Sequence, residues 1–333
     1  MNLAPRSVSL WIALLVLAFA PLSIHAQSCQ TSSDLEDAPR AAITAAGQRY
    51  FDMVAKGDVA TLRQNAIPSL ASDFSVIEGM VKDRQQDLAG AQGTAKGVFL
   101  LDGTTPVPHA EFFCGVFGKN GQTSNSAAFF LNNLPAGKYG VVLLDGTSAK
   151  GRTMVTLILQ QAGTDWKLAG LFIKHAEVAG HNSDWFLARA REYKTKGQMH
   201  NAWLYYLVAR NLMSPVNFMS TLATDKLYDE WQSQMPLDIP ANEKTADLLA
   251  GTVTYKLTAM LPDAVGNDVY LMAKYQVADL SNTTQTYQAN VAVMKALLAK
   301  FPEVKDAFAG VEARAVDPSG QDYGTLLAMK DIK

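Results

Sequence analysis

The sequence predicts an α+β protein, in which a helix-wrapped, curved antiparallel sheet is followed by a helical hairpin and a small C-terminal ββαββ domain. Three observations predict this class. Apolar residues recur at helical spacing over 41–88. Short runs rich in β-branched and aromatic residues, separated by Gly, Asn, Pro and Asp, occupy 98–175, and helical spacing returns over 184–231. Helices followed by a run of antiparallel strands are typical of α+β domains.

The first residues have the pattern of a secretory signal peptide. Arg6 supplies a positive charge, Leu10–Ala20 is an unbroken apolar run, and Ala26 is a small residue at the expected cleavage point. The apolar run is shorter than the roughly 20 residues that a membrane span needs. We therefore expect residues 1–26 to be removed, Gln27 to be the mature N-terminus, and the protein to be exported, either to the periplasm or as a secreted protein.

The mature chain is expected to be slightly acidic. Loss of Arg6 reduces the 29 Lys and Arg residues to 28 against 31 Asp and Glu, a net charge of about −3. Nucleic-acid binding needs a basic face, which this chain does not offer. No later segment is long and apolar enough to span a membrane. These features predict a soluble protein that has no nucleic-acid partner.

Two cysteines, Cys29 and Cys114, remain after cleavage. An exported compartment is oxidising, so the simplest expectation is one disulfide between them. In the chain-entropy model such a bond is worth on the order of 4 kcal/mol. The alternative is a lipid on Cys29, as in a bacterial lipoprotein, although the preceding residues 26–28 lack the usual leucine.

Residues 27–40 are expected to form a polar N-terminal tail, and residues 41–180 the first domain. Asp58 is a good N-cap for its second helix, Pro68 ends or kinks that helix, and Leu70–Leu88 predicts a third. The expected strands are Val98–Leu101, Glu111–Phe117, Ala127–Leu131, Tyr139–Leu144, Thr153–Gln160 and Trp166–His175.

The string LLDGT occurs twice, at 100–104 and at 143–147. Asp-Gly after an apolar strand is a hairpin signal, so the duplicate predicts two similar turns. The sequences between the two copies do not match, which argues against a repeated unit.

The first domain resembles the nuclear-transport-factor-two-like fold, a cone-shaped group that includes ketosteroid isomerases. The resemblance rests on Tyr50-Phe51 followed by Gly57-Asp58 in the helical pair, and on the closing strand Asp165–Leu168. It implies a concave, mostly apolar interior of the kind that holds small ligands.

Few residues of the first domain are candidates for ligand binding or catalysis. Tyr50, Phe113 and Trp166 are candidates to line the interior of the cone and to hold a small apolar ligand, with simple filling of the core as the alternative. Asp102 and Asp145 could form a carboxylate pair for acid/base work, but a turn already explains an Asp at each position.

Residues 181–235 predict a helical hairpin with a break at Lys196-Gly197. The pattern resembles one tetratricopeptide repeat, in which small residues let two helices approach closely. The residues that carry it are Ala190, Tyr193, Gly197, Ala202, Tyr206 and Ala209. Since stacking needs about three repeats, the resemblance implies a single hairpin that packs on another part of the chain. We expect 184–214 to pack against the first domain.

Aromatic residues are dense in this hairpin, and they are candidates for a face that binds a protein partner or a second copy of the chain. They are Trp185, Tyr193, Trp203, Tyr205 and Tyr206. Because adjacent residues of a helix point in different directions, one of the two neighbouring tyrosines is expected to pack inward and the other to reach the surface. The alternative is a contact between domains.

Residues 236–250 predict a linker, and residues 251–333 a small α+β domain that resembles no known family. The sequence contains no nucleophile-elbow, phosphate-loop or zinc-protease motif. His175 and His181, around Glu177, could ligate zinc, although their spacing fits neither one helix face nor a tight hairpin. We expect no metal, cofactor or catalytic residue.

The expected function is a binding or assembly role in the cell envelope. The alternative is a small-molecule enzyme or carrier that uses the cavity of the cone.

Overall fold

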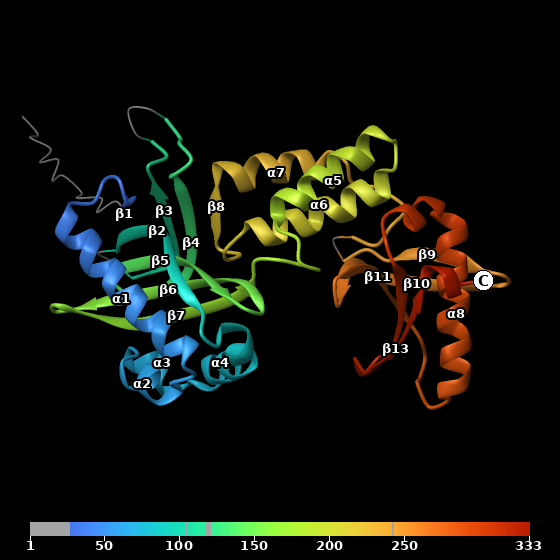
Figure 1. Cartoon of the computed structure of the whole chain (residues 1–333), viewed down its shortest axis with the longest axis horizontal. Coiled ribbons are helices and arrows are strands. Elements are labelled where there is room, and N and C mark those ends of the chain that lie inside the picture. Colours follow the sequence, from blue (N-terminus) through green and yellow to red (C-terminus); the bar gives the residue numbers. More distant parts are fainter. Residues whose placement is uncertain (1–26, 104–105, 118–120, 242) are drawn as a thin grey trace, which may run out of the picture.

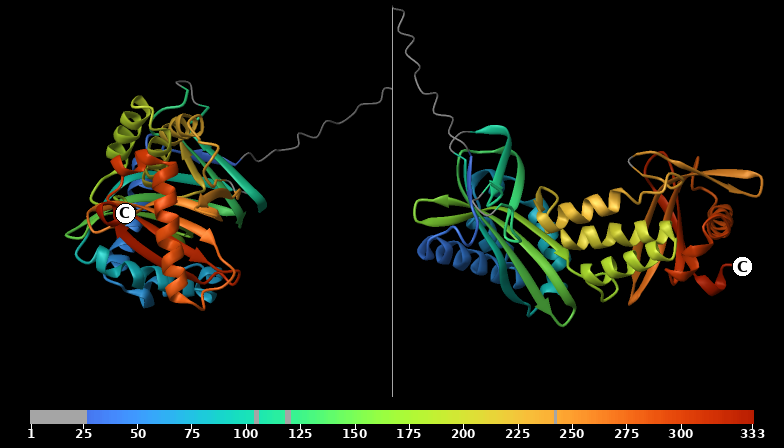
Figure 2. Two further views of the ribbon diagram at one scale, coloured as in Figure 1. Left: turned by 90° about the vertical axis from the view of Figure 1, so that its right-hand side faces the viewer. Right: turned by 90° about the horizontal axis from the view of Figure 1, so that it is seen from above.

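Three parts of the chain follow one another along the long axis of the molecule (Figure 1). The computed structural model describes residues 27–103, 106–117, 121–241 and 243–333, so the expected signal peptide lies outside the described residues. A helix-covered sheet lies at one end, three helices form the middle, and a second sheet with a long helix lies at the other end (Figure 2). The arrangement confirms the α+β class.

The first part contains four helices and a five-stranded antiparallel sheet. The helices are α1 (Asp37–Ala55), α2 (Val59–Gln64), α3 (Pro68–Ser72) and α4 (Ser75–Leu88). The sheet has the order β1-β2-β5-β6-β7, with β1 (Ser28–Gln30), β2 (Gln92–Gly103), β5 (Gly137–Ser148), β6 (Gly151–Ala162) and β7 (Asp165–His175).

Two expected features of this part take a different form. The segment expected as a polar tail supplies the edge strand β1, which pairs with β2. The single helix expected over 70–88 is divided into α3 and α4. Pro68 starts α3, where the missing N–H of proline costs nothing. Asp58 caps α2 as expected, because its side chain accepts a hydrogen bond from the Thr61 amide at 3.1 Å.

The core of the first part lies between α1 and the sheet. Gly93 of β2 and Gly146 of β5 are cross-strand partners, and the ring of Phe51 lies over both. A Cβ would come within 2.7 Å of that ring at Gly93 and within 3.1 Å at Gly146. The glycine of the second LLDGT string therefore makes room for a phenyl ring and does not form a turn. The turn expected at 143–147 is wrong, because these residues lie inside β5.

A second, three-stranded sheet packs beside the first. Its order is β3-β4-β8, with β3 (Val107–Cys114), β4 (Ala127–Leu134) and β8 (Met219–Thr221). β8 comes from the segment after the helical hairpin, so its pairing with β4 fastens that segment to the first part. The expected disulfide is present: Cys29 of β1 is bonded to Cys114 of β3, with Cα atoms 4.7 Å apart.

The middle of the molecule contains the expected hairpin and one further helix. The helices are α5 (Ser183–Thr195), α6 (Met199–Met213) and α7 (Leu222–Gln232). Gly197 has a φ of 73° in the turn between α5 and α6, a left-handed conformation that glycine adopts without strain. None of the helices in the described ranges combines the length and the apolar character that crossing a membrane requires.

The C-terminal part is a mixed sheet covered by one long helix. The sheet has the order β13-β12-β11-β10-β9, with β9 (Ala246–Ala250), β10 (Val253–Val265), β11 (Asp268–Gln276), β12 (Gly310–Val316) and β13 (Asp322–Ala328). The helix α8 (Thr283–Lys300) connects the parallel strands β11 and β12. The expected ββαββ order is thus preceded by β9, which forms from the end of the segment expected as a linker.

The helical hairpin shares its hydrophobic core with the C-terminal part. Buried residues of α5 and α6 form one cluster with those of β10, β11, α8 and β12. The Tyr193 hydroxyl donates to the carbonyl of Asp306 at 3.2 Å, and the Tyr205 hydroxyl donates to the carbonyl of Ala307 at 2.5 Å. The expectation that the hairpin packs against the first domain is therefore wrong: the chain that follows α8 covers its aromatic face.

Candidate functional site

A cavity of about 630 Å³ lies where the three parts of the chain meet. This volume is within the range of about 300–1,000 Å³ that is typical of ligand pockets. We call it the junction cavity. Its lining residues are Phe130, Val178, Leu207, Val208, Arg210, Asn211, Ser214, Asn217, Met219, Ser220, Thr224, Asp225, Tyr228, Leu261 and Pro262.

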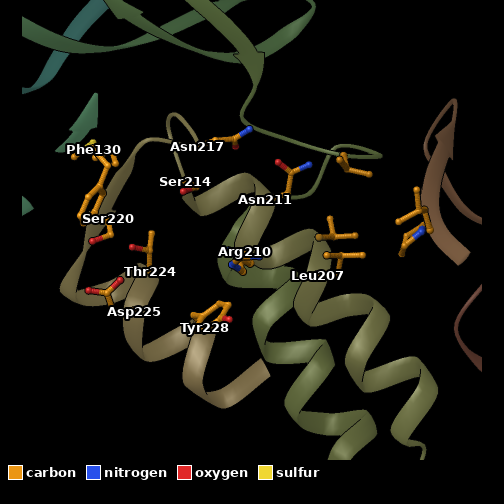
Figure 3. A pocket seen from close by; sticks show the side chains of 15 residues that line it. Phe130, Leu207, Arg210, Asn211, Ser214, Asn217, Ser220, Thr224, Asp225 and Tyr228 are labelled. Carbon is orange, nitrogen blue, oxygen red and sulfur yellow. The ribbon is translucent and has the colours of Figure 1, made fainter. Parts of the chain in front are cut away.

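Each part of the molecule contributes one wall. Phe130 of β4 and Ser220 of β8 lie on the same face of the three-stranded sheet, since Ser220 pairs with Ala128, two residues before Phe130. Leu207 stands on α6, and Leu261 lies on β10 of the C-terminal sheet. Phe130 and Leu207 lie on opposite sides of the space in Figure 3. The cavity therefore exists only when the three parts are packed together.

Among the described residues that line the cavity, Arg210 is the only basic one. Its guanidinium lies over the rings of Tyr228 and Trp231, 4.8 and 5.0 Å from their centroids. Among the described residues no carboxylate oxygen lies within 4 Å of it, and Asp225 in the same lining is exposed. The two aromatic faces stabilise the cation by cation–π attraction without neutralising its charge. Arg210 can therefore take a carboxylate from a bound molecule.

Lys174 fixes one edge of the junction cavity. This residue of β7 donates from Nζ to the carbonyls of Asn211 and Ser214, at 2.5 and 2.9 Å, and to Oδ1 of Asn211 at 2.9 Å. All three N–H groups of the ammonium are thus used at the C-terminal end of α6, where the helix dipole favours a positive charge. Burial lowers the pKa of Lys174, because desolvation penalises the charged form.

The three helices are held together by an ion pair with a third partner. Arg191 of α5 forms two hydrogen bonds with Glu230 of α7, at 3.0 and 2.8 Å, and the Tyr206 hydroxyl of α6 donates to Glu230 at 2.5 Å. The hydrogen bond from Arg191 and that from Tyr206 outweigh the effect of partial burial and lower the pKa of Glu230. The orientation of α7, and with it that of Tyr228, depends on this contact.

The residues expected to line a cone cavity do not surround a shared space. Tyr50 is fully buried, and its hydroxyl donates to the carbonyls of Asn65 and Trp166, both at 2.9 Å. Trp166 belongs to the same packed core. Phe113 lies on the other sheet, with its side chain exposed. The interpretation of Tyr50, Phe113 and Trp166 as a ligand cavity is wrong, because Tyr50 and Trp166 fill the core and Phe113 points outward.

The aromatic residues expected as a partner face are mostly buried within the chain. Tyr193, Trp203, Tyr205 and Tyr206 are each at most 4% exposed, and Trp185 is half-buried against His181. Burial raises the pKa of Tyr205 and Tyr206. The prediction that one of these two tyrosines reaches the surface is wrong, because α7 covers one side of α6 and the C-terminal part covers the other.

The other candidate groups are also separated. His175 contacts Arg84 and Asp87, whereas His181 stacks on Trp185 with ring centroids 3.8 Å apart, so the two histidines do not share a site. No group of three or more potential metal ligands occurs among the described residues.

The two aspartates do not form a pair either. Asp102 is opposite Lys138 near the start of β5 and lies 3.5 Å from it, whereas Asp145 lies near the end of that strand, 2.8 Å from Arg152. Each carboxylate therefore forms an ion pair with a different basic residue.

No feature of the amino-acid sequence predicted the junction cavity. Its lining comes from four separate stretches of chain, and no motif surrounds Arg210 or Phe130. Comparison with family models, with curated proteins and with solved structures finds no match for this chain. The geometry of the junction cavity is therefore the basis for inferring its function.

Proposed function

We propose that this chain is an exported protein of the cell envelope, periplasmic or secreted, whose role is to bind another molecule in the junction cavity. One observation carries the proposal: three parts of the chain, each with its own elements, contribute side chains to a single space of about 630 Å³. Ligand sites occur preferentially at such junctions between domains. The Cys29–Cys114 disulfide supports the exported location, because such bonds persist in oxidising compartments.

The lining supports binding by its composition. Apolar side chains such as Phe130, Leu207 and Leu261 offer buried contact area. Amide and hydroxyl groups lie among them and can fix the orientation of a bound molecule. Arg210 adds a single positive charge to this lining.

Native mass spectrometry of the protein purified from its own compartment tests the proposal. The wild-type protein is expected to retain a bound mass, either a ligand, a partner or a second copy. Ser220→Trp places an indole on the cavity wall and is expected to abolish retention. Tyr287→Trp, on the exposed surface of α8, is the matched control and should retain the mass. Retention by Ser220→Trp, or a wild-type protein that never carries a bound mass, contradicts the proposal.

A further inference from the structure

A strip of exposed aromatic rings leads along the three-stranded sheet to the junction cavity. Phe117 is 82% exposed, Phe113 39% and Phe130 44%. The ring centroids of Phe113 and Phe117 are 5.5 Å apart, and those of Phe113 and Phe130 are 6.3 Å apart, both pairs in edge-to-face contact. Phe130 also lines the cavity, so the strip and the cavity are continuous. We call these three residues the phenylalanine strip.

From this continuity we infer that the junction cavity and the phenylalanine strip bind one extended polypeptide segment, which has apolar side chains at alternate positions and a carboxylate that reaches Arg210. The inference rests on the proposed function, because it names the class of partner for the same cavity. It extends the site outward along the sheet to residues that the cavity alone does not include.

The spacing of the rings matches an extended peptide. A strand advances about 3.3 Å per residue and places side chains i and i+2 on one face, so neighbouring side chains of that face are about 6.6 Å apart. The ring separations of 5.5 and 6.3 Å are close to this repeat. An extended segment could therefore place successive apolar side chains over successive rings. Exposed phenyl rings in a row also form a surface that is unfavourable in water unless it is covered.

The polar lining favours a peptide over an acyl chain. Asn217 and Ser220 carry an uncharged amide and an uncharged hydroxyl group in the cavity, whereas the Thr224 hydroxyl is used in the capping box of α7. Such groups match the N–H and C=O groups of a peptide backbone, which each need a partner when they leave water. An acyl chain has no polar groups for them. Arg210 provides charge complementarity to a carboxylate at one end of the segment.

Fluorescence anisotropy with a labelled octapeptide tests the inference. The peptide has phenylalanine at its first, third and fifth positions, serine elsewhere, the label at its N-terminus and a free C-terminal carboxylate. One matched peptide ends in an amide, and another has its three phenylalanines adjacent. The full exported chain is expected to bind the first peptide about tenfold more tightly than either of the others.

Two variants separate the parts of the site. Phe113→Ser is expected to weaken binding about tenfold, and Arg210→Gln is expected to reduce the preference for the carboxylate over the amide to less than about twofold. Tyr287 is an aromatic residue of similar exposure on α8, and Tyr287→Ser should change neither quantity. Circular dichroism melts of each variant verify that the fold is kept.

The outcomes distinguish this inference from the proposed function. If Ser220→Trp abolishes retention of the native bound mass while Phe113→Ser leaves peptide binding unchanged, the cavity binds its ligand without the strip and the inference fails alone. Equal binding of the three peptides also overturns it. If decanoate displaces the peptide and binds with the same dependence on Phe113 and Arg210, the site recognises an amphiphile and the peptide assignment is wrong.

Discussion

Replacement of Trp203 by alanine is expected to destabilise the protein by about 3 kcal/mol. Trp203 on α6 is 4% exposed and stacks on Trp231 of α7, with ring centroids 5.5 Å apart. A buried aromatic side chain removes about 200 Å² from water, worth about 5 kcal/mol at 25 cal/mol per Å². Trp203 Nε1 is buried without a hydrogen-bond partner among the described residues, an arrangement that costs about 1–3 kcal/mol. The difference places the net loss near 3 kcal/mol.

A second variant tests this explanation of the magnitude. Trp203→Phe keeps most of the ring and removes the unpartnered N–H, so we expect it to cost less than about 1.5 kcal/mol. Urea denaturation followed by far-ultraviolet circular dichroism gives both free energies of unfolding, and Tyr287→Ala is the exposed control, expected to stay within about 0.5 kcal/mol of wild type. The reasoning is refuted if Trp203→Ala costs less than about 1 kcal/mol, or if the phenylalanine variant costs as much as the alanine variant.

Three further predictions concern two sets of polar contacts and the disulfide. Lys174→Met removes three hydrogen bonds to the end of α6, and limited proteolysis is expected to cut the segment between β7 and α5 faster than in wild type; an unchanged cleavage rate contradicts this. Because the pKa of Glu230 is lowered in the folded state, the contribution of Glu230 to stability is present above its ordinary pKa of 4.5 and is lost as the pH falls through the lower folded value. Arg191→Met should reduce this loss of stability in acid, measured as melting temperature against pH. An unchanged profile argues against the ion pair. Reduction of the Cys29–Cys114 bond is expected to lower the free energy of unfolding by about 4 kcal/mol, and a denaturation midpoint that is insensitive to reductant contradicts that estimate.

Features that depend on interactions between neighbouring residues could be predicted from the amino-acid sequence. The α+β class, the strands of the first part and the helical hairpin follow from hydrophobic periodicity, which is a local property. Asp58 as an N-cap and Gly197 in the hairpin turn follow from backbone chemistry that acts over a few residues. The Cys29–Cys114 pairing could be predicted because the chain contains only two cysteines.

Which surfaces pack against each other depends on the three-dimensional arrangement of the whole chain. Periodicity shows that α6 has apolar faces, but it does not show that α7 covers one of them and the C-terminal part the other, so the surface position expected for Tyr205 or Tyr206 was wrong. The Asp-Gly at 145–146 matches a turn locally, yet the close approach of Phe51 makes it part of a strand. The junction cavity has the same origin. Phe130, Arg210 and Leu261 are far apart in sequence, and they share one space because the packing of three separate parts, which has no periodic signature in the chain, brings them together.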